Sequence, residues 1–325
     1  PMNHHAAQVF LMAACFSLLA GCAGPGIGKY KDVVVADVPT SPESGVRVTY
    51  LGVNGYLLQS ADATVLVDPF FSRPPASTYV FAGEVKPDKS RIDWAMRSFP
   101  ATVDLILVTH GHIDHLLDVP IIAQRTGAKI VASPTSCNLV KSLKQVPDWQ
   151  IEPILTQSNP TLESSETKQF DSVTVQALYS DHDRICGMDI WPGTKHEAGT
   201  PPKRGREWVA GEPLAFIVTM GGKRIFISSG MVHAPQQKNL APVDLAITGV
   251  ALKNPRKALA ETVRVLKPKY VLPSHQDDFF IPAEKGFRFS KQSNFEEVKK
   301  NLPPPEWEPG KNLILLDYFR PWTLY

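Results

Sequence analysis

Three histidines and one aspartate lie within six residues, in the stretch HGHIDH at positions 110–115. The stretch directly follows the continuous apolar run 105–108, which is typical of a buried strand. Imidazole and carboxylate groups suit zinc and similar first-row ions. Alternate residues of a loop point the same way, so His110 and His112 can bind one ion while Asp114 and His115 turn toward a second. This spacing favours a metal site over a polar surface loop with chance histidines.

Strands and helices alternate around this stretch, in two halves that each open with strands. Such an order favours two mixed β-sheets covered by helices. The apolar patterns predict strands at 46–51, 56–58, 63–67, 105–108, 129–132, 173–178, 214–219, 224–228, 245–247 and 270–273, and helices at 119–126, 136–144 and 255–266.

Length and charge narrow the classes of function. The chain has 325 residues, of which 43% are hydrophobic, and this is ample for a large core. With 34 basic and 32 acidic side chains, the net charge of +2 gives no indication of a nucleic-acid partner. We expect a signal peptide at 1–21, a tether rich in Gly and Pro at 22–45, and one hydrolase domain at 46–325.

The N-terminus reads as a targeting segment. The apolar run 9–20 is too short to span a bilayer as a helix, and it leads into Leu-Ala-Gly-Cys at 19–22. This sequence resembles a bacterial lipobox, which implies cleavage before Cys22 and lipidation of that residue. Ala23 then implies an anchor in the outer membrane, facing the periplasm. An ordinary secretory signal with an incidental cysteine is the alternative.

The stretch at 110–115 resembles the His-x-His-x-Asp-His signature of the metallo-β-lactamase superfamily, and the resemblance extends over about residues 46 to 320. It implies an α/β fold, the αββα four-layer sandwich of two mixed β-sheets flanked by helices. It also implies one or two divalent metal ions, with zinc expected first and manganese or iron as alternatives. The ligands carried over are His110, His112 and His182 for one ion, and Asp114, His115 and His275 for the other.

One position departs from the family pattern. The family commonly has Gly-Asp-Thr after a strand, and its Asp bridges both metals. Here Ser228-Ser229-Gly230 occupies that place, so Ser229, or Ser228 if the register shifts by one, replaces the Asp. His233 could act as a surrogate, although a surface histidine is the alternative. The departure predicts weaker occupancy of the second metal site.

Asp68 begins the stretch DPFFSR at 68–73. The stretch resembles the Asp-Pro-x-Phe-Ser-x-Arg stretch of the branch that includes the ascorbate-phosphate lactonases and the N-acyl-phosphatidylethanolamine phospholipases D. The resemblance implies that Asp68 supports a metal-bound histidine without binding the metal itself. A turn aspartate before proline is the alternative.

The resemblance implies a hydrolase that uses a metal-activated hydroxide, oriented by Asp114, on an ester, lactone or phosphodiester bond. The substrate would be a small or lipid-like molecule, such as an amphiphile of the bacterial envelope. A β-lactam hydrolase and a non-catalytic metal-binding lipoprotein are the alternatives. The basic loop 193–211 reads equally as a lid, a contact for lipid phosphates or a solvated loop. The aromatic residues that follow His275, Phe279 and Phe280 among them, either line an apolar pocket or pack beneath loops.

Overall fold

The structure is a computed structural model that describes residues 24–325, except 38–43, 81–82, 158–159, 162, 183, 186–187, 231–239, 241, 252, 292, 294 and 304–305. Cys22 and His233 lie outside the described residues, so lipidation and the surrogate histidine stay predictions. Among the described residues, no helix is both long and apolar enough to cross a bilayer.

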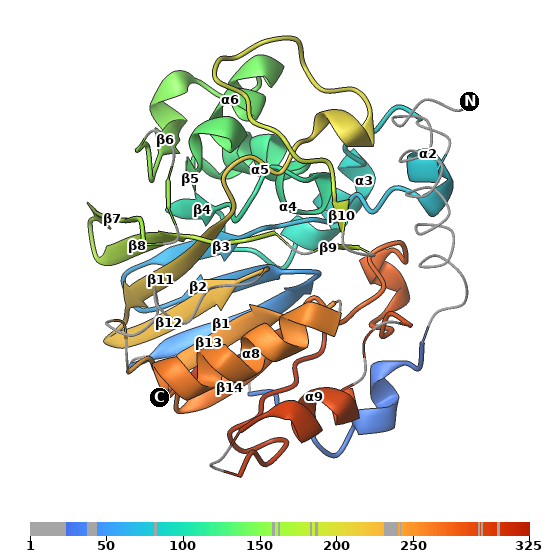
Figure 1. Cartoon of the computed structure of the whole chain (residues 1–325), viewed down its shortest axis with the longest axis vertical. Coiled ribbons are helices and arrows are strands. Elements are labelled where there is room, and N and C mark those ends of the chain that lie inside the picture. The colour runs from blue at the N-terminus through green and yellow to red at the C-terminus, as the bar shows by residue number, and fades with distance from the viewer. Residues whose placement is uncertain are drawn as a thin grey trace.

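The first sheet has seven strands in the order β15-β1-β2-β3-β4-β5-β6 (Figure 1). Strands β15 to β3 are antiparallel, and β3 to β6 are parallel. The strands are β1 (Val46–Gly52), β2 (Gly55–Gln59), β3 (Thr64–Val67), β4 (Leu105–Leu107), β5 (Lys129–Ala132), β6 (Ile151–Pro153) and β15 (Pro321–Leu324).

The second sheet has six strands in the order β14-β13-β12-β11-β8-β7. Its strands are β7 (Ser165–Phe170), β8 (Val173–Tyr179), β11 (Leu214–Met220), β12 (Lys223–Ser228), β13 (Leu245–Gly249) and β14 (Tyr270–Ser274). A separate hairpin pairs β9 (Arg184–Ile185) with β10 (Met188–Asp189).

Helices cover the outer face of each sheet (Figure 1). Helices α5 and α6 contact β5, and α8 contacts β13. The four layers are therefore helix, sheet, sheet and helix, so the predicted αββα sandwich is confirmed. The helices are α2 (Ala76–Val80), α3 (Lys89–Met96), α4 (Ile113–Leu116), α5 (Val119–Thr126), α6 (Pro134–Leu143), α8 (Lys253–Leu266) and α9 (Phe295–Asn301), with short 3-10 helices η1 (Ile27–Tyr30), η2 (Asp148–Gln150), η3 (Gly205–Glu207) and η4 (Ala283–Lys285).

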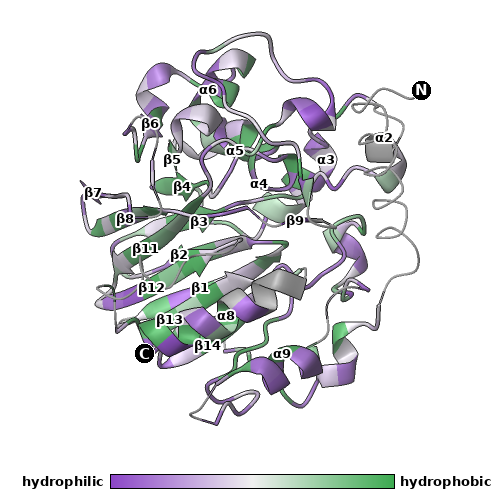
Figure 2. Ribbon diagram, viewed as in Figure 1, coloured by the Kyte–Doolittle hydropathy of each residue, from purple (hydrophilic) through white to green (hydrophobic). Residues whose placement is uncertain are grey.

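The core is divided by the two-residue period of the strands, whose successive side chains point to opposite faces. In β4, Leu105 and Leu107 pack between the two sheets, whereas Ile106 packs under the helices of the first sheet. In β12, Ile225 and Ile227 face the other sheet, and Phe226 lies in a third cluster with Leu266 of α8. Apolar residues accordingly follow the strands of both sheets in Figure 2.

Every strand and helix range predicted from the apolar patterns lies within two residues of the observed bounds. The sequence analysis missed three edge strands, β6, β7 and β15, as well as the β9–β10 hairpin and helices α2, α3, α4 and α9. Strand β7 alternates between exposed and half-buried residues, so it carries little apolar signal. Residues 24–37, placed in the tether, contact the domain through Gly24 N–H to Phe289 O at 2.9 Å and Val35 N–H to Leu315 O at 3.0 Å.

A fully buried ion pair joins the loop after β3 to the loop after β14. Arg73 Nη2 lies 2.8 Å from Asp277 Oδ2, and neither side chain is exposed. Tyr50 and Tyr318 donate their hydroxyls to the same carboxylate, and Val53 N–H donates to Asp277 Oδ1 at 2.8 Å. Burial raises the pKa of Asp277, but the Arg73 charge and these donors outweigh burial, so its pKa is lowered overall.

We expect Asp277→Asn to lower the free energy of unfolding by about 3–5 kcal/mol, because it leaves the buried Arg73 charge uncompensated. A carboxylate with a lowered folded pKa stabilises above its unfolded pKa of about 3.9, and this stability is lost as pH falls through the folded value. The difference between the two proteins should therefore shrink in acid. Urea unfolding measures both effects. Asp189→Asn, which breaks the exposed pair with Arg184, is the control and should cost less than about 1 kcal/mol; equal costs would contradict the expectation.

Candidate metal centre

The histidine stretch leaves the sheet at the carboxyl end of β4. Asp68 N–H, at the end of β3, donates to Leu107 O at 3.0 Å, and Gly111 N–H donates to Ala210 O at 3.0 Å. A Cβ added at position 111 would lie 2.3 Å from Val209 O, so only glycine fits between the two histidines. The backbone of the loop is thus held from both sides before any ion binds.

The structure brings His110, His112 and His182 together, and their facing nitrogens all lie within 4.8 Å of one another. His110 Nε2 is 3.1 Å from His112 Nδ1 and 3.1 Å from His182 Nε2. His110 and His112 are buried, whereas His182 at the end of β8 is half-buried. We call these residues the first triad.

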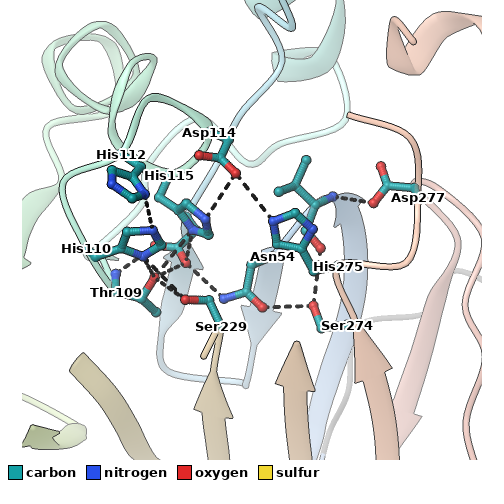
Figure 3. Close-up of polar contacts among 12 residues, drawn as sticks. Asn54, Thr109, His110, His112, Asp114, His115, Ser229, Ser274, His275 and Asp277 are labelled. Atoms are coloured by element: carbon teal, nitrogen blue, oxygen red, sulfur yellow. Dashed lines mark hydrogen bonds and ion pairs between the residues drawn. The ribbon is translucent and has the colours of Figure 1, made fainter. Parts of the chain in front are cut away.

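The second triad is Asp114, His115 and His275. Asp114 Oδ2 lies 3.3 Å from His115 Nε2 and 3.3 Å from His275 Nε2 (Figure 3). The rings of His110 and His115 are 3.9 Å apart between centroids, so the two triads adjoin. Asp114 and His275 retain side-chain exposures of 16% and 13%, which makes this the more accessible triad.

Asp68 lies behind both triads and is fully buried. Its Oδ2 is 2.8 Å from His115 Nδ1 and accepts from Thr109 Oγ1 at 2.6 Å. Because a carboxylate can only accept, Nδ1 of His115 carries a proton, and Nε2 points toward the centre. The hydroxyl hydrogen of Thr109 is donated to Asp68, so the hydroxyl oxygen accepts from His110 Nδ1 at 3.1 Å. Asp68 thereby orients the rings of two histidines, one in each triad.

His275 comes from the other sheet, directly after β14. Its backbone has φ +54°, the left-handed region, and its N–H donates to Val53 O at 2.8 Å. Ser274 donates to Asn54 Oδ1 at 2.8 Å, and Asn54 Nδ2 donates to Asp68 Oδ2 at 2.9 Å (Figure 3). The ligand candidates of the two sheets are therefore connected through Asn54.

Protonation differs between the triads. Burial, together with the neighbouring histidines, lowers the pKa of His110 well below its ordinary value and that of His112 to about 3. Burial also lowers the pKa of His115, but the carboxylates of Asp114 and Asp68 outweigh it and raise the value to about 10. Burial raises the pKa of Asp114, but His115 and His275 together outweigh burial and lower the value, so Asp114 is ionised. His110 and His112 of the first triad are thus neutral imidazoles, and the second triad offers one anionic carboxylate.

These donor sets fit divalent first-row ions. Three neutral imidazoles form the common nitrogen set for such an ion, and two imidazoles with one carboxylate form another. His110 Nε2, His112 Nδ1 and His182 Nε2 converge although nitrogens repel one another unless a proton or an ion lies between them. The same convergence occurs around Asp114 Oδ2.

Ser228 and Ser229, at the position that departs from the family pattern, have different hydrogen-bond partners. Ser229 Oγ lies 3.3 Å from His110 Nδ1 and 3.2 Å from Thr109 Oγ1. Ser228 is fully buried, and its hydroxyl donates to Gly230 O at 2.7 Å. Ser229 is therefore the serine that contacts a ligand candidate, through the Nδ1 side of the His110 ring.

The sequence analysis did not assign roles to Asn54, Thr109 or Trp191. Thr109 directly precedes the histidine stretch, and this adjacency was an available signal. Asn54 lies in the β1–β2 turn, and no residue pattern there distinguishes it from an ordinary turn asparagine. Trp191, whose ring lies 5.9 Å from that of His112, comes from a segment 79 residues further along the chain, between η3 and β10.

Comparison with known proteins agrees with this geometry. A family model described as a Beta-lactamase superfamily domain matches residues 47–275. A UPF0173 metal-dependent hydrolase of Pyrococcus furiosus is 29% identical over 238 residues, which cover 71% of this chain and 84% of that protein.

Two solved structures share the fold. Igni18, a metallo hydrolase of Ignicoccus hospitalis, has a TM-score of 0.50 and 17% identity, and the alignment covers 82% of this chain and 97% of that one. CmlA, a diiron beta-hydroxylase from Streptomyces venezuelae, has a TM-score of 0.51 and 14% identity, and the alignment covers 88% of this chain and 55% of that one. The family model matches more than two thirds of the sequence, and on that ground the chain belongs to the metallo-β-lactamase superfamily.

Proposed function

We propose that this chain is a metal-dependent hydrolase that cleaves an ester, lactone or phosphodiester bond. The observation that carries the proposal is the pair of adjoining triads, which offers five imidazoles and one carboxylate at one edge of the sandwich. His110, His112 and His182 would hold one divalent ion, and Asp114, His115 and His275 the other. Bound ions would supply Lewis-acid polarisation of a carbonyl or phosphoryl oxygen and a lowered pKa for water.

The residues of the chain contribute orientation and proton transfer. Asp114 is the one carboxylate among the six ligand candidates, and it is ionised and partly exposed. It is therefore placed to orient a water molecule by accepting a hydrogen bond from it. Asp68, fixed by Asn54 and Thr109, keeps the ring nitrogens of His115 and His110 directed into the centre.

The bond class rests on the stretch Asp68–Arg73. Its resemblance to the branch of lactonases and phospholipases D supports an ester, lactone or phosphodiester over a β-lactam. The contacts of Asp68 with His115 and Thr109 agree with the supporting role that this resemblance implies.

We expect alanine substitutions to separate the two proposed sites. His112→Ala should abolish binding of the first ion, and His275→Ala should abolish binding of the second, because each removes one of three ligands. The number of bound ions is measured by calorimetric titration of metal-stripped protein with zinc and by elemental analysis of the zinc-loaded protein. His196→Ala, which changes an exposed histidine beside Thr194, is the matched control and should leave two ions bound. Unchanged stoichiometry in all three variants would refute the ligand assignment.

Ser229→Asp should raise the affinity of the second ion by at least about tenfold, because it restores a carboxylate at the position where the family commonly has its bridging Asp. In the unaltered chain, Ser229 is neutral, and Asp114 is the one anionic ligand candidate. Zinc titration of metal-stripped protein should then show two unequal sites before the substitution and two tight sites after it. Ser172→Asp, in the β7–β8 turn at the surface, serves as the control. Two equally tight sites in the unaltered chain would show that another residue supplies the missing charge.

A panel of reporter substrates tests the reaction itself. Zinc- or manganese-loaded protein should hydrolyse at least one of a nitrophenyl ester, a lactone and a bis-nitrophenyl phosphate, and Asp114→Asn should lower kcat at least about a hundredfold. Nitrocefin is the β-lactam in the panel. Hydrolysis of nitrocefin alone would replace the proposal with a β-lactamase, and no turnover by fully loaded protein would favour a metal-binding protein without catalysis.

A further inference from the structure

An aromatic side chain stands beside each triad. The ring of Trp191 is 5.9 Å from that of His112 between centroids, at an interplanar angle of 87°. The ring of Phe279 is 6.1 Å from that of His275 at 86°, and it packs against Phe280 at 4.2 Å. Trp191, Phe279 and Phe280 are all partly exposed.

Trp191 is held in an unfavourable backbone conformation. Its φ is +36°, a region that costs a bulky residue energy and that persists only where surrounding contacts fix it. Ala210 N–H donates to Trp191 O at 3.0 Å. A Cβ added at Gly205 would lie 3.0 Å from Trp191 Cη2, so the glycine allows the indole to lie against the backbone. Strained residues of this kind gather at functional sites.

The segment that carries Trp191 is fixed to the domain. Lys195 N–H donates to Thr135 Oγ1 at 3.0 Å, and Asn138 donates to Lys195 O at 2.7 Å, so α6 anchors the segment. Gly111 N–H, between the histidines, donates to Ala210 O at its other end. Trp191 therefore stands on a support that is continuous with the metal centre.

The accessible atoms of the centre lie where the aromatic residues are. The side chains of His110, His112 and His115 are buried, whereas those of Asp114, His182 and His275 are partly exposed. Phe279 lies beside the partly exposed His275, and Trp191, itself partly exposed, lies beside His112, whose ring is 4.5 Å from that of the partly exposed His182. The aromatic side chains thus lie close to the partly exposed ligand candidates.

We propose that Trp191 and Phe279 are specificity-determining residues that contact an alkyl group beside the scissile bond, so that the substrate is an amphiphile. The proposal rests on the proposed hydrolytic function. Rigid aromatic side chains bury alkyl surface at low entropic cost, and each methylene that leaves water strengthens binding about fourfold. A polar substrate of the same bond class would gain nothing from these residues.

Binding of non-hydrolysable ligands tests the proposal without turnover. Octylphosphonate and methylphosphonate share one headgroup, and their dissociation constants for the zinc-loaded protein are measured by calorimetry. In the unaltered chain, octylphosphonate should bind at least about thirtyfold more tightly. Trp191→Ala and Phe279→Ala should each reduce this preference about tenfold and leave methylphosphonate binding and zinc content unchanged, whereas Trp191→Phe should keep most of it. Trp149→Ala is the matched control, because Trp149 is 69% exposed and precedes β6 at the opposite end of the sheet.

The ester series in the reporter panel gives a second measurement. The ratio of kcat/KM for octanoyl over acetyl nitrophenyl ester should fall about tenfold in Trp191→Ala and remain unchanged in Trp149→Ala. Hydrolysis with no chain-length preference, or a preference that survives both aromatic substitutions, would overturn the inference and leave the proposed function standing. Octylphosphonate binding that depends on Trp191, in a protein that hydrolyses nothing, would refute the proposed function and support the aromatic contact.

Discussion

The buried carboxylate of Asp68 is the constraint on which the site depends. A carboxylate without solvent must be satisfied by donors, and Asp68 takes them from Asn54, Thr109 and His115. Satisfying it fixes the proton positions of His115 and, through Thr109, of His110. The backbone at Asp68 itself has φ +40°, which places the side chain under the histidine loop at a conformational cost. One buried charge therefore orients the rings of His115 and His110, one histidine in each triad.

The second sheet is aligned with this charge by a different buried network. Arg73 and Asp277 pair without exposure, and Asp277 also accepts from Val53 N–H in the turn that receives His275 N–H. A Cβ at Gly52 would lie 2.0 Å from Arg73 Nη2, so glycine is required for the guanidinium to reach the carboxylate. The ion pair therefore determines where the loop that carries His275 lies against the first sheet. Asp68 orients the ligand candidates of the first sheet, and Asp277 holds the loop that carries His275 against that sheet.

The sequence could predict the features of the fold and the site that depend on neighbouring residues, but not those that depend on residues far apart in the chain. The strands were predicted because apolar runs and alternation are local, and the histidine stretch at 110–115 because its ligands are adjacent. His182 and His275 were placed by strand ends together with family resemblance. Arg73 and Asp277 are 204 residues apart, and no local pattern reports that they pair. Trp191 was missed for the same reason, since only folding of the 191–211 segment onto α6 brings it to His112.

Buried and exposed parts of the site consequently have different origins. The imidazoles of His110 and His112 in the first triad are buried and neutral, so the scaffold determines their chemistry. Trp191 and Phe279 come from connecting segments, and connections of this kind vary more readily than the strands that they join. A family signature can therefore identify the ions and leave the substrate open. Selection of the substrate then depends on which side chains the connections hold beside the exposed ligands, and in this chain those side chains are aromatic and fixed.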